Sequence, residues 1–163
     1  MQDNKLIKAL VLNAQLGNNS AFEQLYQITI EPIYVLILRL TGNTSSAEIL
    51  TKKTYVNAWQ KISQKDEFSS ILSWLKKIAI ETVLADKSIE NKSAGILDVK
   101  FFGDNPFEKY IQDLEFRNRL IYILHDIENF SFEEISKLSG ISNDDIKTLL
   151  VTTRENLINL TEE

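Results

Sequence analysis

The chain contains no cysteine and only one histidine among its 163 residues. It therefore cannot form a disulfide or a thiolate metal site, and a histidine-based metal site is not expected either. No apolar run approaches the roughly 18 residues that a membrane-spanning helix needs, and the longest candidate is the short stretch from Ile33 to Leu40. The first ten residues, MQDNKLIKAL, contain no signal-peptide core. We therefore expect a cytoplasmic protein with no membrane segment and no cofactor.

Side chains that could perform catalysis are also scarce. His125 stands next to Asp126, but no nucleophile, glycine-rich loop or carboxylate cluster accompanies the pair. Asp144 and Asp145 are adjacent acids at the expected start of a helix, where they suit the helix dipole and need no metal. We therefore expect no enzyme and no small-molecule substrate.

The chain does contain enough apolar residues to build a core, since 44% of it is hydrophobic and 25% is charged. Its net charge of −5 is unevenly spread. Residues 1–90 are nearly neutral, whereas residues 131–163 contain three basic and seven acidic residues. Proteins that bind DNA concentrate Lys and Arg where they meet phosphate. The C-terminal segment, residues 131–163, has no such concentration of Lys and Arg.

Apolar residues in the first half recur at helical spacing, and no segment alternates with the period of a strand. The pattern predicts a helix over residues 3–16 that ends at Gly17, and a second helix up to Leu40. Pro32 should kink or split this second helix, because it supplies no N–H group. Possible capping boxes at Ser20 and Ser45 precede the second and third helices. A fourth helix is predicted from Phe68 to Asp86, and Trp59 and Trp74 are expected in the core.

The second half begins with a loop rich in Gly, Asn and Pro, which predicts a linker over residues 91–106. Helix resumes at Pro106 and extends, with a break, to Ile127. The stretch from Ser131 to Leu157 then has the pattern of a helix-turn-helix, with capping residues before each helix and Gly140 in the turn. We expect an all-α chain of two small helical domains, over residues 1–90 and 107–163. The linker has four apolar residues, which could dock on a domain: Ile96, Leu97, Phe101 and Phe102.

Several fragments, in this order, resemble the bacterial RNA polymerase sigma factors of the extracytoplasmic-function class. Residues 21–26, AFEQLY, resemble the family's AFEELY, and residues 38–42, LRLTG, resemble LRLTGD. Residues 131–141, SFEEISKLSGI, resemble SYEEIAEILGI. Smaller matches are Ala58-Trp59 to RAW, and Phe68, Trp74-Leu75 and Ile78-Ala79 to the family's F-x-x-W-L-x-x-I-A. The resemblance implies a four-helix domain like sigma region 2 and a helix-turn-helix domain like sigma region 4.

The resemblance also implies partners and contact residues. The family binds core RNA polymerase and promoter DNA, and its third helix carries an acidic core-binding surface. The matching region of this chain has Ile49 at an acidic position and contributes the core-binding candidates Glu48, Lys52 and Lys53. The candidates for DNA contact are Lys76 and Lys77 in the fourth helix, and Lys147, Thr148, Thr152 and Arg154 in the last helix.

Two hypotheses follow from the resemblance and from these departures. The first is a sigma factor that directs core polymerase to promoters by binding DNA. The alternative is a degenerate sigma-like protein that has lost DNA and core binding and acts as a protein-interaction or regulatory module. Leu149 and Val151 lie off the core stripe of the last helix, so an anti-sigma partner or self-association stays open.

Overall fold

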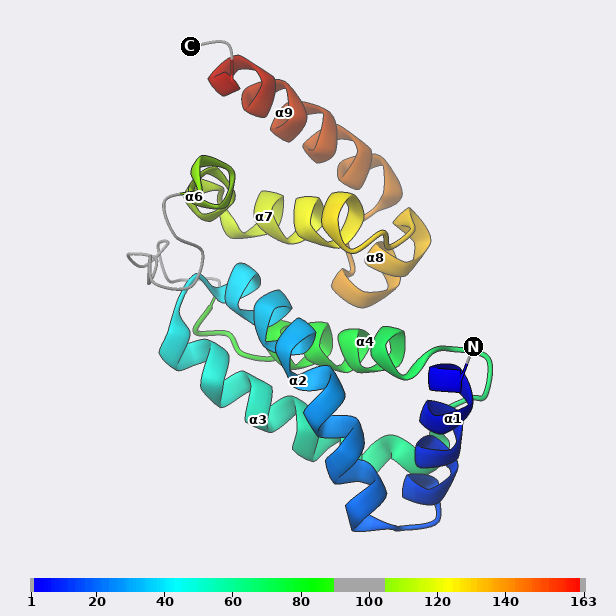
Figure 1. Cartoon of the computed structure of the whole chain (residues 1–163). Coiled ribbons are helices and arrows are strands. Elements are labelled where there is room, and N and C mark those ends of the chain that lie inside the picture. The colour runs from blue at the N-terminus through cyan, green and yellow to red at the C-terminus, as the bar shows by residue number, and fades with distance from the viewer. Residues whose placement is uncertain (1, 90–104, 162–163) are drawn as a thin grey trace. The chain divides into compact units, whose positions relative to one another are not determined.

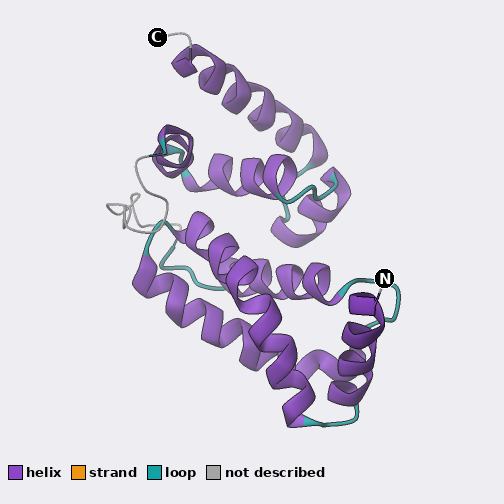
Figure 2. Cartoon of the chain, viewed as in Figure 1, coloured by secondary structure: helices purple, strands orange, loops and turns teal. Residues whose placement is uncertain are grey.

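The computed structural model describes residues 2–89 and 105–161, and all regular structure in these ranges is helical (Figures 1 and 2). The predicted all-α fold class is confirmed. No helix in these ranges is both long and apolar enough to span a bilayer. The α-helices are α1 (Gln2–Gln15), α2 (Asn19–Thr41), α3 (Thr44–Lys61), α4 (Ile71–Leu84), α6 (Pro106–Asp113), α7 (Phe116–Tyr122), α8 (Phe132–Ser139) and α9 (Asn143–Thr161). A 3₁₀ turn, η1 (Ile62–Gln64), follows α3, and a π-helical turn, η2 (Ile123–Ile127), extends α7.

The chain forms two compact units. The first consists of Met1–Ile37 and Ser45–Val83, and the second of Leu38–Thr44 and Leu84–Glu163. The last turn of α2 thus belongs to the second unit. The predicted linker, with its apolar residues Ile96, Leu97, Phe101 and Phe102, lies outside the described residues except at its last two positions.

The core of the first unit comes from the apolar stripes of α2, α3 and α4. Of the predicted kink or split at Pro32, the split does not occur, because α2 runs unbroken through this residue. Ile28, whose carbonyl would normally accept the missing N–H of Pro32, is exposed, so water can replace that bond. The core residues on these helices include Leu25, Ile33, Leu36, Ile37, Leu50, Ala58, Leu75 and Ile78.

Aromatic side chains join α2 to α3. The ring of Trp59 lies 5.0 Å from that of Phe22, and the rings of Tyr26 and Tyr55 meet edge to face at 4.7 Å. The Tyr55 hydroxyl lies 2.8 Å from Thr29 Oγ1, and both are buried. Burial raises the pKa of Tyr55 to about 12. Trp59 and Trp74 are half-buried at the core's edge.

The fourth helix begins at Ile71, so its predicted start at Phe68 is wrong. The cause is a turn around Asp66, whose carboxylate accepts hydrogen bonds from the backbone N–H groups of Phe68 and Ser69 at 2.9 and 2.8 Å. These bonds and one from the Ser69 hydroxyl lower the pKa of Asp66. Ser70 Oγ then accepts from Ser73 N at 3.0 Å and caps α4. Phe68 is left almost fully exposed.

The second unit contains the helix-turn-helix, formed by α8 and α9. The capping box at Ser131 is confirmed, since Ser131 and Glu134 exchange side-chain-to-backbone bonds. Gly140 ends α8 with φ +73°, a left-handed conformation that favours glycine. Ile141 follows and is buried, and the core also holds Leu120, Ile123, Leu124, Ile135, Ile146 and Leu150.

Candidate functional site

Helix α9 presents the predicted DNA-contact residues on its exposed surface. Lys147, Thr148 and Thr152 are all exposed. The hydroxyls of Thr148 and Thr152 donate to the carbonyls of Asp144 and Thr148, at 2.9 and 3.1 Å. Each hydroxyl still has lone pairs that can accept a hydrogen bond. This face can therefore offer one cation and two hydroxyl groups to a ligand.

Arg154, the other predicted DNA-contact residue of α9, is already paired. Both carboxylate oxygens of Asp126 in η2 accept hydrogen bonds from its guanidinium. Arg154 Nε lies 2.8 Å from Asp126 Oδ2, and Nη2 lies 2.5 Å from Oδ1. The bond to Asp126 raises the pKa of Arg154. Paired guanidinium and carboxylate groups of this geometry are among the stronger hydrogen-bonded pairs in proteins. Arg154 must leave Asp126, or share it, before it can contact a phosphate.

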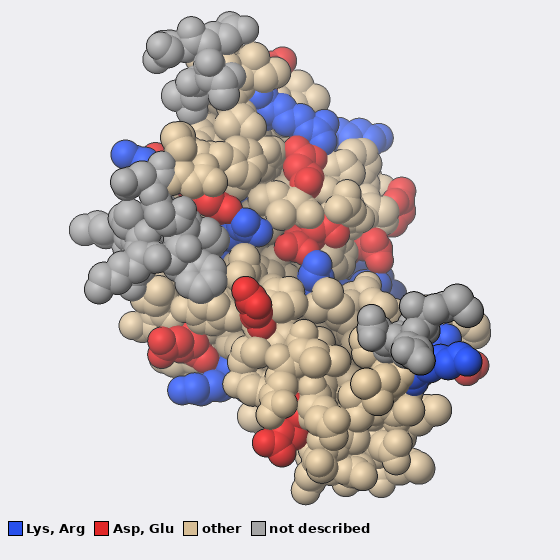
Figure 3. Space-filling view, in the orientation of Figure 1, with Lys and Arg blue, Asp and Glu red and all other residues tan. Residues whose placement is uncertain are grey.

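Acidic groups surround the start of α9. Asp144 and Asp145 are exposed in its first turn, where they complement the helix dipole. Asp144 Oδ1 lies 3.6 Å from Lys147 Nζ, and Asp145 Oδ2 lies 3.7 Å from Arg117 Nη2. Figure 3 shows acidic and basic side chains interspersed on the face in view, without a large continuous basic patch. Phosphate binding by this helix therefore depends on few cations.

Helix α3 in the first unit carries the predicted core-binding residues. Glu48, Lys52 and Lys53 are all exposed on it, together with the aliphatic side chains of Ile49 and Val56. Within the described residues, neither lysine forms a salt bridge. The face therefore combines aliphatic area with two positive charges.

The remaining two candidates, Lys76 and Lys77, lie half-buried on α4 in the first unit. Each is already engaged in an interaction. They are thus less available to a ligand than the lysines of α3.

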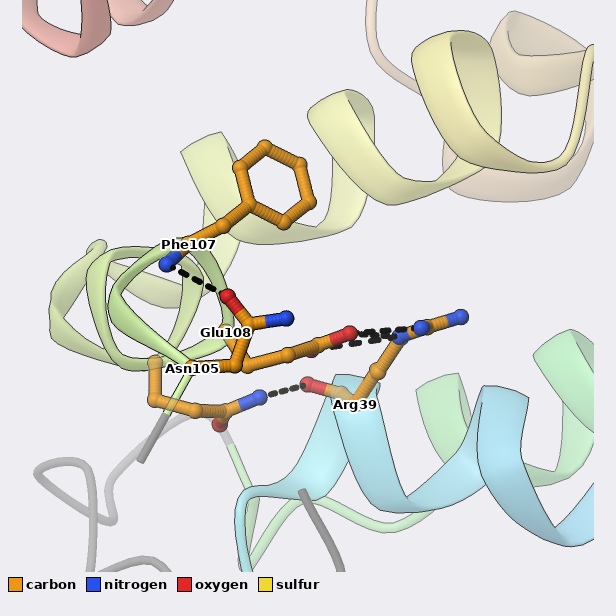
Figure 4. Close-up of polar contacts among 5 residues, drawn as sticks. Arg39, Asn105, Phe107 and Glu108 are labelled. Atoms are coloured by element: carbon orange, nitrogen blue, oxygen red, sulfur yellow. Dashed lines mark hydrogen bonds and ion pairs between the residues drawn. The ribbon is translucent and has the colours of Figure 1, made fainter. Parts of the chain in front are cut away.

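A polar cluster that sequence reasoning missed lies in the second unit, at the end of α2 (Figure 4). Arg39 donates to both carboxylate oxygens of Glu108 in α6, and its Nη2 lies 2.5 Å from Glu108 Oε1. Gln112 Nε2 donates to the Arg39 carbonyl at 3.1 Å. Arg119, buried in α7, donates to the Gln112 carbonyl at 3.0 Å, and burial lowers its pKa. The cluster holds the last turn of α2 against α6, which is a structural role.

Also missed was a groove in the first unit, of about 540 Å³, between α1 and the segment from Lys65 to Leu72. Val11, Leu12 and Phe68 contribute apolar surface to it. Lys65 also lines the groove, and its ammonium donates to the carbonyls of Asp66 and Ser69 at 2.6 Å each. Among the described residues, no three His, Asp or Glu side chains converge as metal ligands would.

Comparison with curated proteins finds two sigma factors of Bacillus subtilis (strain 168). The chain is 24% identical to the ECF RNA polymerase sigma factor SigW, over 93% of its own length and 95% of the relative's. It is 25% identical to the RNA polymerase sigma factor SigV, over 74% of its own length and 78% of the relative's. No family model matches the sequence.

Solved structures share the fold. CnrH, solved in complex with the cytosolic domain of CnrY, matches with a TM-score of 0.67 at 18% identity, over 96% of this chain and 97% of that one. The sigma factor RpoE was solved in complex with the anti-sigma factor NepR from Bartonella quintana. It matches with a TM-score of 0.62 at 21% identity, over 86% of this chain and 96% of that one. The chain is thus similar in sequence to two bacterial RNA polymerase sigma factors, one of them of the extracytoplasmic-function class, and it shares its fold with a third sigma factor.

Proposed function

We propose that this protein is a sigma factor that binds core RNA polymerase and directs it to promoters. The observation that carries the proposal is the similarity to SigW over 93% of this chain and 95% of the relative, which includes both helical segments. A sigma factor acts by binding and catalyses no reaction itself. It works where polymerase and DNA are, so the proposal places this protein in the cytoplasm.

The proposed DNA contact is made by α9, the second helix of the helix-turn-helix. Lys147 supplies a phosphate contact, and Thr148 and Thr152 supply hydroxyl groups on the same exposed face. Arg154 adds a second cation when it is released from Asp126. With so few cations, we expect weak binding to isolated DNA, with a shallow dependence on salt. Tight promoter binding then needs polymerase.

The proposed polymerase contact is made by α3, around Glu48, Lys52 and Lys53. Each lysine would repel a basic partner surface by about 1 kcal/mol or more per close pair. The polymerase surface that meets α3 must therefore offer carboxylates or apolar groups opposite these lysines. Lys76 and Lys77 on α4 are proposed to contact DNA near the start site.

The comparisons do not favour the alternative of a degenerate protein without DNA or core binding, because the matched curated proteins are named as sigma factors. RpoE was solved with an anti-sigma factor. We therefore propose that this chain is also controlled by an anti-sigma factor.

The proposal is tested by gel filtration of the purified chain with core polymerase at low salt and at about micromolar protein, a range in which specific protein complexes form. We expect the two to co-elute. The double variant Lys52→Ala, Lys53→Ala should change the affinity, whereas Lys109→Ala, an exposed lysine in α6, should not. Separate elution, together with no promoter-specific transcript, would contradict the proposal.

A further inference from the structure

Two helices of the chain expose aliphatic faces with the same spacing. On α3, Ile49 and Val56 are 61% and 58% exposed. On α9, Val151 and Ile158 are 54% and 56% exposed. In each helix the two residues are seven positions apart, which places them two turns apart on one side and about 10 Å along the axis. The two faces could therefore lie against each other with both aliphatic pairs in contact.

The charges between these aliphatic pairs are opposite in sign. Lys52 and Lys53 lie between Ile49 and Val56 and are exposed. Glu155 lies at the equivalent place between Val151 and Ile158 and is also exposed. Its neighbour Arg154 is neutralised by Asp126. No salt bridge is formed by Lys52, Lys53 or Glu155 within the described part of the chain, so all three can pair with another molecule.

We propose that this protein self-associates by docking the α9 face (Val151, Glu155, Ile158) of one copy on the α3 face (Ile49, Lys52, Lys53, Val56) of a second copy. Each copy carries both faces, so the contact joins unlike surfaces and can be made twice within a pair or continued along a chain of copies. A second copy fits because the complementary spacing and charge both occur in this one sequence.

Self-association would affect the proposed function. The association itself can be tested without polymerase. Val151 and Glu155 lie on the same side of α9 as Thr148 and Thr152, because these positions are three or four residues apart. The α3 face includes the lysines proposed to meet polymerase. Association would thus cover both surfaces, and the protein would limit its own availability as its concentration rises.

The contact should be weak and sensitive to salt. Each contact joins two turns of helix, which is less area than a stable dimer interface usually buries. The charged pairs lie at the surface, where salt screens them. We therefore expect association that is visible only at tens of micromolar or above and that decreases between about 50 mM and about 500 mM salt.

Sedimentation velocity of the full chain tests the proposal, over about 1 to about 200 µM, a range that brackets weak association. The wild-type sedimentation coefficient should rise with concentration. The variants Lys52→Glu/Lys53→Glu and Glu155→Lys should each associate at least tenfold more weakly, because like charges then face each other. All three residues are exposed, so the variants should keep the wild-type melting temperature.

Mixing the two variants is the decisive step. The reversed α3 face of one variant carries glutamates and the reversed α9 face of the other carries a lysine, so each contact between unlike variants has opposite charges again. An equimolar mixture should regain wild-type association. The matched controls Lys109→Glu and Glu133→Lys alter exposed charges on α6 and α8 and should associate as the wild type does. A wild-type chain that stays monomeric, single variants that associate normally, or a mixture that stays monomeric would each overturn the proposal.

Discussion

Asp126 determines how Arg154 can act. The carboxylate holds both the Nε and an Nη of the guanidinium, and α9 loses one of its two cations to this pair. Removing the charge of Asp126 while keeping its shape should release Arg154 toward solvent and toward phosphate. The ion pair thus sets the charge that α9 would offer to DNA under the proposed function.

The variant Asp126→Asn should bind duplex DNA more tightly than the wild type. Each added phosphate contact steepens the dependence of log K on log salt by about 0.9. We expect a salt slope steeper by about one unit, measured by fluorescence anisotropy of a labelled duplex over a series of salt concentrations.

Asp113→Asn, which removes an exposed acid at the end of α6, is the matched control for total charge. A variant slope equal to that of this control would show that Arg154 does not reach DNA.

Tyr55 makes stability depend on pH in the alkaline range. Its pKa is raised from 10.0 to about 12 by burial, so the folded state keeps the phenol protonated where the unfolded state ionises it. This contribution is fully present below pH 10 and is lost as pH rises toward 12. The difference in unfolding free energy between wild type and Tyr55→Phe should therefore shrink steadily between about pH 9 and about pH 11. Urea unfolding at each pH measures it, and a difference that is constant with pH would contradict the assignment.

Gly140 fixes the end of α8 and the direction of α9. Its φ of +73° is left-handed, and no atom lies within 4 Å of a built Cβ, so a side chain there meets strain without a clash. We expect Gly140→Ala to lower the free energy of unfolding by about 1 kcal/mol or more. Gly140→Asn should cost less, because asparagine tolerates this conformation better. Urea unfolding compares the two, and an Ala variant as stable as the Asn variant would contradict the argument.

The pair of Arg39 and Glu108 joins the last turn of α2 to α6. Glu108 is 5% exposed, so Glu108→Gln leaves Arg39 without its carboxylate in a largely buried place. The expected loss is about 2 kcal/mol or more in unfolding free energy.

Replacing both members by methionine should cost less than the single change, because no unpaired charge remains. Urea unfolding of the wild type, Glu108→Gln and the double methionine variant measures these differences in the free energy of unfolding. A double variant that is less stable than Glu108→Gln would show that the pair contributes net stability beyond the avoided penalty.

Local signals in the sequence predicted most of the elements. The 3.6-residue period located the helices, and the Ser131 capping box and Gly140 placed the turn of the helix-turn-helix correctly. Local chemistry also caused the errors: Pro32 is tolerated inside α2, and the Asp66 turn delays α4 to Ile71. These two outcomes depend on solvent access and on hydrogen bonds in the folded chain, which periodicity does not report.

Side-chain pairs between distant positions could not be predicted. Arg154 and Asp126 are 28 residues apart, and Arg39 and Glu108 are 69 apart. No spacing rule connects such residues, because the fold alone brings them together. The candidate residues on α3 and α9 were predicted from the family resemblance, and their exposure is compatible with contact. Which of them touches polymerase or DNA is still a prediction.

At the scale of the whole molecule, the account depends on both units acting together with polymerase. The first unit presents α3, and the second presents α9 with a small number of cations. Because the α9 face carries few cations, we expect it not to bind DNA tightly by itself. The account therefore predicts weak DNA binding by the isolated chain and promoter selection only within the complex with polymerase.

Promoter-specific transcription in a reconstituted system tests this central claim most directly. Core polymerase, the purified chain and a library of genomic fragments should give transcripts that begin at discrete sites and that require the chain. Lys147→Glu should reduce these transcripts at least tenfold by replacing a phosphate contact with a repulsive charge, whereas Lys109→Glu should leave them unchanged. Transcripts that are absent, or that are equally abundant without the chain, would contradict the account.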